Sequence, residues 1–299
     1  MEMKEKVLVI VGPTASGKTK LAVGLARRFN GEIVSADSRQ VYRGMDIGTG
    51  KDLKEYGTIK YYCIDIASPK RQFTVAQFKR CAEAAIQDIV KRGRLPIVVG
   101  GSGLYISALV DGLQLQTGKP DAEIRKRLGK KTLVQLLALL KRVDLTTYKV
   151  IDKKNRRRVE RALEIYYQTG KRKSQIARRT VSPYDFLQIG VVVPKEKLKK
   201  NIAKRLQQRL EQAGMIDEVR RLRRQGVNFK RLEDFGLEYR YIARYLQKKI
   251  TYEEMVEQLQ KAIWQFSKRQ MTWFKRDPRI IWVTIGREAV SQIKRLLNR

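Results

Sequence analysis

The residues best suited to chemistry form one short loop near the N-terminus. The phosphate-binding pattern G-x-x-x-x-G-K-[ST] is matched at every position by Gly12-Pro13-Thr14-Ala15-Ser16-Gly17-Lys18-Thr19. In such a loop the backbone N–H groups point at a phosphate, the lysine adds a positive charge, and the threonine hydroxyl can bind Mg²⁺. We therefore expect these eight residues to hold a diphosphate or triphosphate, with Lys18 and Thr19 among the catalytic residues.

A phosphate-binding loop of this kind usually works with a carboxylate at the end of a neighbouring strand, which helps to hold Mg²⁺. Asp37 directly follows the strand-like run Glu32–Ala36. Asp65 is an alternative, but it lies inside its own run, Cys63–Ile66. Because ligands of parallel sheets gather at the carboxyl ends of the strands, Asp37 is the better-placed partner of Thr19 for the metal.

These residues need a parallel sheet to position them, and the first hundred residues alternate between strand-like and helix-like patterns. The expected strands are Val7–Val11, Glu32–Ala36, Cys63–Ile66 and Pro96–Gly100. The expected helices are Lys18–Phe29, Thr74–Arg92 and Leu104–Val110. The fold class is thus α/β, with a P-loop NTPase-like parallel sheet core over residues 1–115.

The rest of the chain is mostly helical. Residues 116–184 read as a basic, helical inserted segment that begins near the linker-like Thr117–Pro120. Residues 185–299 begin with a strand, Leu187–Val193, which we expect to return to the sheet, and then become helix-rich. In this half an apolar stripe runs at helical spacing through Tyr252, Val256, Leu259, Ile263 and Phe266. A last strand, Ile280–Val283, and a terminal helix complete the expected elements.

Composition limits the chemistry and indicates a partner. The 299 residues include 65 Lys and Arg, 30 Asp and Glu and no histidine, a formal net charge of +35. Without histidine, Ser-His-Asp triads and histidine-based zinc sites are excluded, so proton transfer must use carboxylates, Tyr, Lys, Cys or water. The positive charge favours a nucleic-acid partner, although a generally basic composition is an alternative. No run is long and apolar enough for a membrane span or a signal peptide, so we expect a cytoplasmic protein.

Further motifs identify a family. The phosphate loop is followed in order by Asp37-Ser38-Arg39-Gln40-Val41-Tyr42, Gly44–Thr49, Gly100–Tyr105, Asn155–Glu164 and Lys268–Phe274. Together these motifs resemble tRNA dimethylallyltransferases, also called tRNA isopentenyltransferases, over nearly the whole chain. The resemblance implies transfer of a dimethylallyl group from dimethylallyl diphosphate to N6 of the adenosine 3′-adjacent to the anticodon, with release of diphosphate. It also implies Mg²⁺ as cofactor and the tRNA anticodon stem-loop as partner; we expect a monomer.

The resemblance assigns roles to single residues. Asp37 is the general base at N6, and Arg205 joins Lys18 and Thr19 in contacting the diphosphate. The positions that match tRNA contacts are Asp37, Ser38, Arg39, Gln40, Ser102, Arg125, Arg157, Arg158, Arg161, Glu238, Tyr239 and Arg240.

Several of these residues have a plainer interpretation. Asp37 could be a helix N-cap, Arg205 an exposed charge on a basic helix, and Arg157–Arg161 a solvated helix face. Trp273 and Phe274, which could stack on bases, are more typical of a core.

The chain departs from the family pattern at two places that bear on the site. Tyr61-Tyr62-Cys63 stands where relatives often carry histidine, so those histidines are not needed for the chemistry here. Gly236–Arg240 varies a glycine-tyrosine motif that in the family contacts the anticodon loop. Three other functions stay open from the residues alone: a P-loop kinase, a nucleotide-gated RNA-binding protein without catalysis, and a prenyltransferase of free adenine nucleotides. The basic helical half counts against the last, because a mononucleotide needs no such surface.

Overall fold

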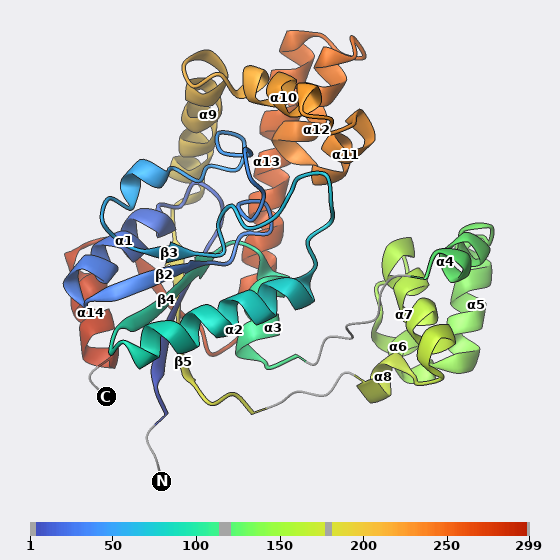
Figure 1. Ribbon diagram of the computed structural model, residues 1–299, viewed down its shortest axis with the longest axis horizontal. Coiled ribbons are helices and arrows are strands. Elements are labelled where there is room, and N and C mark those ends of the chain that lie inside the picture. Colours follow the sequence, from blue (N-terminus) through green and yellow to red (C-terminus); the bar gives the residue numbers. More distant parts are fainter. Residues whose placement is uncertain (1–3, 114–120, 177–180, 298–299) are drawn as a thin grey trace. The chain divides into compact units, whose positions relative to one another are not determined.

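The computed structural model describes residues 4–113, 121–176 and 181–297 (Figure 1). The chain folds into two compact units. The first combines the segment up to Val110 with the segment from Ser182 onward, and the second consists of residues 111–181. The linker-like Thr117–Pro120 and the expected boundary at residue 116 lie outside the described residues.

The first unit is built on a six-stranded sheet with the order β3-β2-β4-β1-β5-β6, and every neighbouring pair is parallel. The strands are β1 (Lys6–Val11), β2 (Gly31–Ser35), β3 (Tyr61–Tyr62), β4 (Leu95–Gly100), β5 (Asp185–Val192) and β6 (Ile281–Thr284). The predicted α/β fold class is confirmed. The predicted return strand is β5, which pairs with β1 at the centre of the sheet.

Helices cover both faces of this sheet, and the side chains of β1 show why. Val7 and Val9 pack into one hydrophobic cluster, while Leu8 and Ile10 pack into another, as the two-residue period of a strand requires. The second cluster includes α1 (Lys18–Arg28) and α14 (Arg287–Leu297). The first includes α2 (Val75–Lys91), α3 (Gly103–Val110) and the C-terminal helices. A strand buried on both faces is apolar throughout, which explains the uninterrupted run after Lys6.

The C-terminal helices are α9 (Lys195–Glu211), α10 (Met215–Arg224), α11 (Phe229–Phe235), α12 (Leu237–Leu246) and α13 (Tyr252–Phe274). The longest, α13, begins at a capping box formed by Thr251 and Glu254. Leu259 and Ile263 of the expected stripe are buried, whereas Tyr252 is exposed and Met255 takes the buried position in that turn. In the part of the chain that the structure describes, no helix has the length and apolar character to cross a membrane.

The second unit contains five helices among its described residues: α4 (Ala122–Gly129), α5 (Leu133–Val143), α6 (Leu145–Val150), α7 (Arg156–Thr169) and α8 (Lys173–Ile176). Its own hydrophobic core centres on Leu136, Leu140 and Leu163. The unit therefore has the apolar interior that a separately folded domain needs.

One predicted strand is wrong. Cys63–Ile66 is not a strand; the sheet edge is instead the two-residue β3. Cys63 and Asp65 have φ angles of 61° and 56°, in the left-handed region that a strand cannot accommodate. The segment bonds elsewhere, because the amides of Asp65 and Ile66 donate to the carbonyls of Gln40 and Val41.

Candidate active site

The phosphate loop, Gly12–Thr19, leaves the carboxyl end of β1 and enters α1 at Lys18. Gly17 is the residue before the helix and has a φ of 82°, a conformation that glycine adopts without the strain a side chain would impose. Ala15 also has a positive φ of 61°. This tight backbone leads directly into a helix N-terminus, which is the arrangement that binds phosphate groups.

Three helical side chains hold the phosphate loop from the other half of the fold. Gln270 on α13 accepts a hydrogen bond from the Thr14 amide at 2.8 Å. On α9, Asn201 donates to the Ala15 carbonyl at 3.2 Å, and the Arg205 guanidinium donates to the Thr14 hydroxyl. Neither Gln270 nor Asn201 was predicted from the sequence as a site residue, although Gln270 lies within the Lys268–Phe274 motif.

One pocket brings together predicted residues of the diphosphate site and predicted residues of the adenine site. Predicted residues that line it are Thr14, Lys18, Thr19, Asp37, Ser38, Arg39, Gln40, Ser102, Arg205 and Glu238. It is also lined by residues that were not predicted, among them Gly48, Thr49, Gly50, Asp52, Tyr56, Phe266 and Gln270. The exposed-charge interpretation of Arg205 is therefore wrong, since its side chain faces this pocket.

Two cations of the pocket, Lys18 and Arg205, are poorly solvated. Burial lowers the pKa of Lys18 to about 8; the Asp37 carboxylate opposes this shift and the Arg205 guanidinium adds to it. Burial, together with the nearby Arg209, lowers the pKa of Arg205 to about 10. The Ser16 hydroxyl is buried and has no hydrogen-bond partner among the described residues. Two poorly solvated cations and an orphaned hydroxyl at one loop are features that an anionic ligand would satisfy.

Asp37 begins a turn, Asp37–Gln40, beside the phosphate loop. Its Oδ1 accepts a hydrogen bond from the Arg39 amide at 2.9 Å. The Ser38 amide donates to Ser102 Oγ at 2.9 Å, which ties the turn to the end of the neighbouring strand β4. No helix follows Asp37, so the helix N-cap interpretation is wrong and the carboxylate instead caps a turn at the pocket edge.

The remaining predicted RNA contacts in the first unit differ in exposure. Arg39 forms an ion pair with Glu238 at 3.2 Å. Gln40 is buried, and its Oε1 accepts from Ser35 Oγ at 2.8 Å. Tyr239 is fully buried and donates its hydroxyl to Glu218 at 2.8 Å, so in this conformation it offers no surface to RNA. Arg240 is partly buried and donates to the Glu233 carbonyl at 3.1 Å.

In the second unit, the predicted arginines lie on or beside α7. Arg125 and Arg161 both pair with Glu164, a carboxylate that is only 2% exposed, at 2.8 and 2.9 Å. This pairing links α4 to α7, so the two arginines have a structural role. The side chains of Arg157 and Arg158 are exposed.

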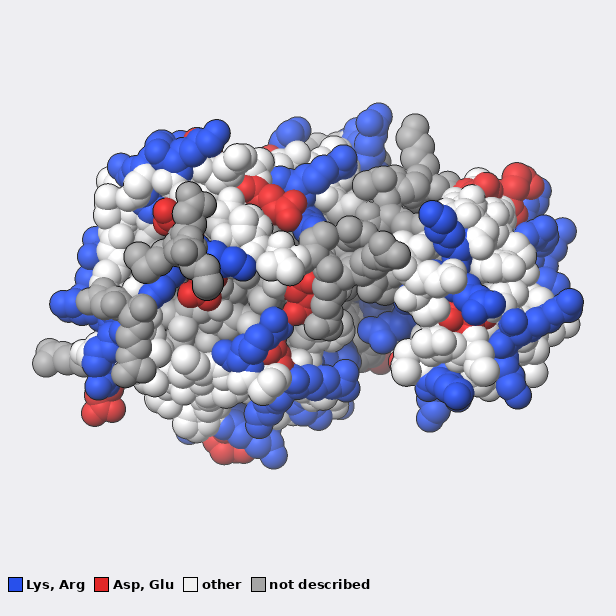
Figure 2. Space-filling view, turned by 90° about the horizontal axis from the view of Figure 1, so that it is seen from below, with Lys and Arg blue, Asp and Glu red and all other residues white. Residues whose placement is uncertain are grey.

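Basic side chains are not confined to one place. On the face in Figure 2, Lys and Arg side chains are dispersed over the surface with fewer acidic ones between them. The net charge of +35 is therefore consistent with a polyanionic partner but does not by itself locate its binding surface.

The described residues contain no group of three or more Asp, Glu or Cys side chains that could hold a metal ion. Thr19 and Asp37 both line the pocket and offer one hydroxyl and one carboxylate. Asp65, the alternative carboxylate, pairs with Lys51 instead and is not among the lining residues.

Comparison with known proteins agrees with this geometry. Residues 40–277 match the family model of the IPP transferases. The chain belongs to the IPP transferase family. It is 44% identical to tRNA dimethylallyltransferase 1 of Geotalea uraniireducens, and the match covers 99% of this chain and 98% of that relative. The resemblance seen in the sequence is confirmed.

Solved structures of related proteins have a fold similar to that of this IPP transferase. A tRNA isopentenylpyrophosphate transferase from Bacillus halodurans is 36% identical, with a TM-score of 0.72 over 99% of this chain and 95% of that chain. A eukaryotic dimethylallyltransferase, described as acting on tRNA, is 26% identical with a TM-score of 0.81 over 95% of this chain and 75% of that one.

Proposed function

We propose that this protein is a tRNA dimethylallyltransferase. It transfers a dimethylallyl group from dimethylallyl diphosphate to N6 of the adenosine 3′-adjacent to the anticodon and releases diphosphate. The observation that carries the proposal is that the phosphate loop and Asp37 open into one pocket, in which the poorly solvated cations of Lys18 and Arg205 lie near the Asp37 carboxylate. The names of the relatives support the same activity.

The phosphate loop holds the leaving group in this reaction. Its amides, Lys18 and Arg205 stabilise the negative charge that grows on the diphosphate as the carbon–oxygen bond breaks. Thr19 and Asp37 are the residues that would bind Mg²⁺. The ion would supply further neutralisation of the leaving diphosphate.

Asp37 receives the proton from the acceptor. The N6 lone pair of adenine is delocalised into the ring, so the amino group is a poor nucleophile. A carboxylate is too weak a base to remove a proton from a neutral amino group. The proton therefore leaves as the carbon–nitrogen bond forms, when N6 becomes positively charged and acidic. The hydrogen bond from the Arg39 amide fixes the carboxylate for this step.

The acceptor adenine must leave the anticodon-loop stack to reach Asp37. Ser38, Arg39, Gln40 and Ser102 line the pocket around Asp37 and are the residues that would meet the extruded base. Arg157 and Arg158 are exposed and suited to phosphate contacts along the stem. Because the substrate is tRNA, we place the protein in the cytoplasm, where it acts as a monomer.

The test is mass spectrometry of tRNA after reaction with dimethylallyl diphosphate and Mg²⁺. We expect a dimethylallyl adduct on the adenosine 3′ of the anticodon, its loss in Lys18→Ala, and its retention in Lys20→Ala, which removes an exposed neighbouring charge. A parallel incubation with ATP labelled at the terminal phosphate tests the kinase alternative. Unmodified tRNA together with transferred phosphate would overturn the proposed function.

A further inference from the structure

One wall of the pocket is a segment without helix or strand. This wall loop, Met45–Lys51, contributes Gly48, Thr49 and Gly50 to the lining. Irregular backbone at a site needs partners for its N–H groups, and those partners decide where the segment lies. Gln40 Nε2 donates to the Gly50 carbonyl at 3.0 Å. This hydrogen bond joins the wall loop to the turn that begins at Asp37, so a shift of the wall loop would also displace that turn.

The main partner of the wall loop is a single carboxylate on α10. Glu218 is 2% exposed, and its Oε2 accepts hydrogen bonds from the amides of Asp46 and Ile47, both at 2.7 Å. Its Oε1 accepts from the Gly48 amide at 3.1 Å and from the Tyr239 hydroxyl at 2.8 Å. Four donors therefore use the full accepting capacity of one carboxylate, three of them from consecutive residues of the wall loop.

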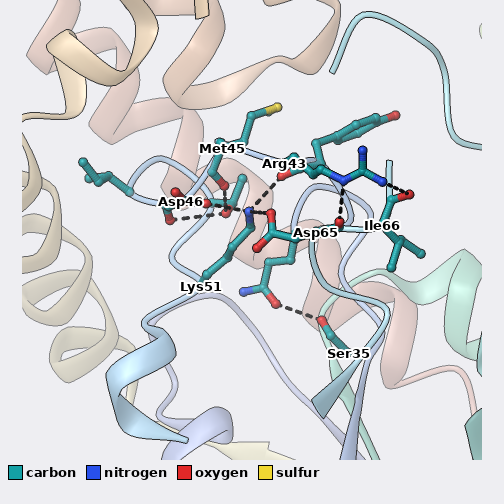
Figure 3. A network of polar contacts seen from close by, with 12 residues as sticks. Ser35, Arg43, Met45, Asp46, Lys51, Asp65 and Ile66 are labelled. Atoms are coloured by element: carbon teal, nitrogen blue, oxygen red, sulfur yellow. Dashed lines mark hydrogen bonds and ion pairs between the residues drawn. The ribbon is translucent and has the colours of Figure 1, made fainter. Parts of the chain in front are cut away.

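A buried cation holds the opposite side of the same loop. Lys51 is 1% exposed, and its Nζ donates to the Tyr42 carbonyl at 2.8 Å and to Asp46 Oδ1 at 2.6 Å. It also pairs with Asp65, and Figure 3 shows the Lys51 side chain reaching between these two carboxylates. The wall loop is thus fixed by Glu218 of α10 on one side and, through its own residue Lys51, by Tyr42 and Asp65 on the other.

The wall loop packs tightly against side chains of the C-terminal helices. A Cβ added at Gly48 would lie 2.8 Å from the Tyr239 ring, and one added at Gly50 would collide with the Arg209 guanidinium. The backbone can approach this closely only because both positions are glycine. A change in the Glu218 contacts therefore moves pocket-lining backbone and not a remote surface.

We propose that Glu218 is a positioning residue for the transfer, and that Tyr239 supports it. Glu218 is not among the pocket-lining residues; it sets the wall loop that borders the diphosphate site and, through Gly50 and Gln40, the turn at Asp37. This inference rests on the proposed function for its catalytic part. Its structural part, the dependence of the diphosphate pocket on Glu218, does not need the transfer reaction.

The decisive variant is Glu218→Gln. Glutamine keeps the size of the side chain but replaces one accepting oxygen with an NH₂ group, which meets N–H donors instead of accepting from them. We expect faster hydrogen exchange at the amides of Asp46, Ile47 and Gly48 in the free protein. We expect at least about tenfold weaker binding of inorganic diphosphate by calorimetry and a similar or larger fall in kcat, because small displacements of positioning groups cost large factors in rate. Affinity for tRNA should stay within twofold.

Two further variants keep the test decisive. Glu233→Gln removes a partly exposed carboxylate of α11 that pairs with Arg244 and Lys249, and it should leave every readout unchanged. If Glu218→Gln does not fold, Tyr239→Phe removes only one donor and should give a several-fold change in the same direction.

Unchanged diphosphate affinity and kcat alongside a lower unfolding temperature would reduce Glu218 to a structural role and overturn the inference. Wild-type protein that binds diphosphate but modifies no tRNA would instead refute the proposed function, while the exchange and calorimetry data would still decide the role of Glu218.

Discussion

The lowered pKa of Lys18 gives a measurable pH dependence of ligand binding. Its pKa is about 8 in the free protein, mainly because burial removes water from the ammonium group. A bound diphosphate places negative charge beside this group and raises its pKa again. Binding must therefore take up a proton when the pH exceeds about 8, and the affinity must fall as the pH rises further.

The size of the effect follows from the protonated fraction of Lys18. With a pKa of about 8, that fraction falls from roughly three-quarters at pH 7.5 to roughly one-thirtieth at pH 9.5, so binding should weaken about 25-fold. Arg205, whose pKa falls to about 10, stays mostly charged in this range and adds a factor of only about 1.3. The ligand itself changes little, because a phosphate group whose last pKa is about 6 is almost fully ionised at pH 7.5.

The assay is calorimetric titration with a non-reactive alkyl diphosphate at half-unit pH steps. Lys18→Arg serves as the control, because a guanidinium keeps its charge over the whole range and its variant should bind with little pH dependence. Circular dichroism at pH 9.5 verifies that both proteins stay folded. An affinity for the wild type that is flat between pH 7.5 and 9.5 would refute the reasoning and remove Lys18 from the diphosphate contacts.

Two other predictions concern the acceptor side and the second unit. Asp37→Asn keeps the hydrogen bond from the Arg39 amide but loses the proton acceptor, so we expect kcat to fall about 10²- to 10⁴-fold with unchanged tRNA affinity in steady-state and binding assays; near-normal turnover would contradict the role of Asp37. Leu163→Ala empties a fully buried position in the core of the second unit and should destabilise it by about 2–5 kcal/mol in denaturant unfolding. Diphosphate binding should persist in this variant, since the pocket residues all belong to the first unit, and loss of that binding would contradict the division into two units.

The phosphate loop and the parallel sheet could be predicted because their signals are local. Adjacent residues encode all of the phosphate-loop pattern: an apolar, buried strand, two glycines at fixed spacing, and a helix that begins at Lys18. Asp37 was predictable for a related reason, since its place after an apolar run puts it at the ligand-binding edge of the sheet.

The parts that could not be predicted depend on partners far away in the sequence. Cys63–Ile66 has the composition of a strand, but a lysine 14 residues before Asp65 and the backbone of the turn after Asp37 hold it in another conformation. Glu218 stands among charged residues on a basic helix, where a solvated position is the default expectation. Only the folded chain shows that its carboxylate is buried against three backbone amides.

The reaction of this pocket is determined as much by the C-terminal helices as by the phosphate loop. Gln270 of α13 bonds the phosphate loop, Glu218 of α10 bonds the wall loop, and Glu238 of α12 bonds Arg39 in the turn after Asp37. Each of these three segments is thus fixed by a helix from the other half of the chain. A phosphate loop alone is common to many reactions, and what distinguishes them is the acceptor geometry built around it. The family model matches residues 40–277, which include these three helices but neither the phosphate loop nor Asp37.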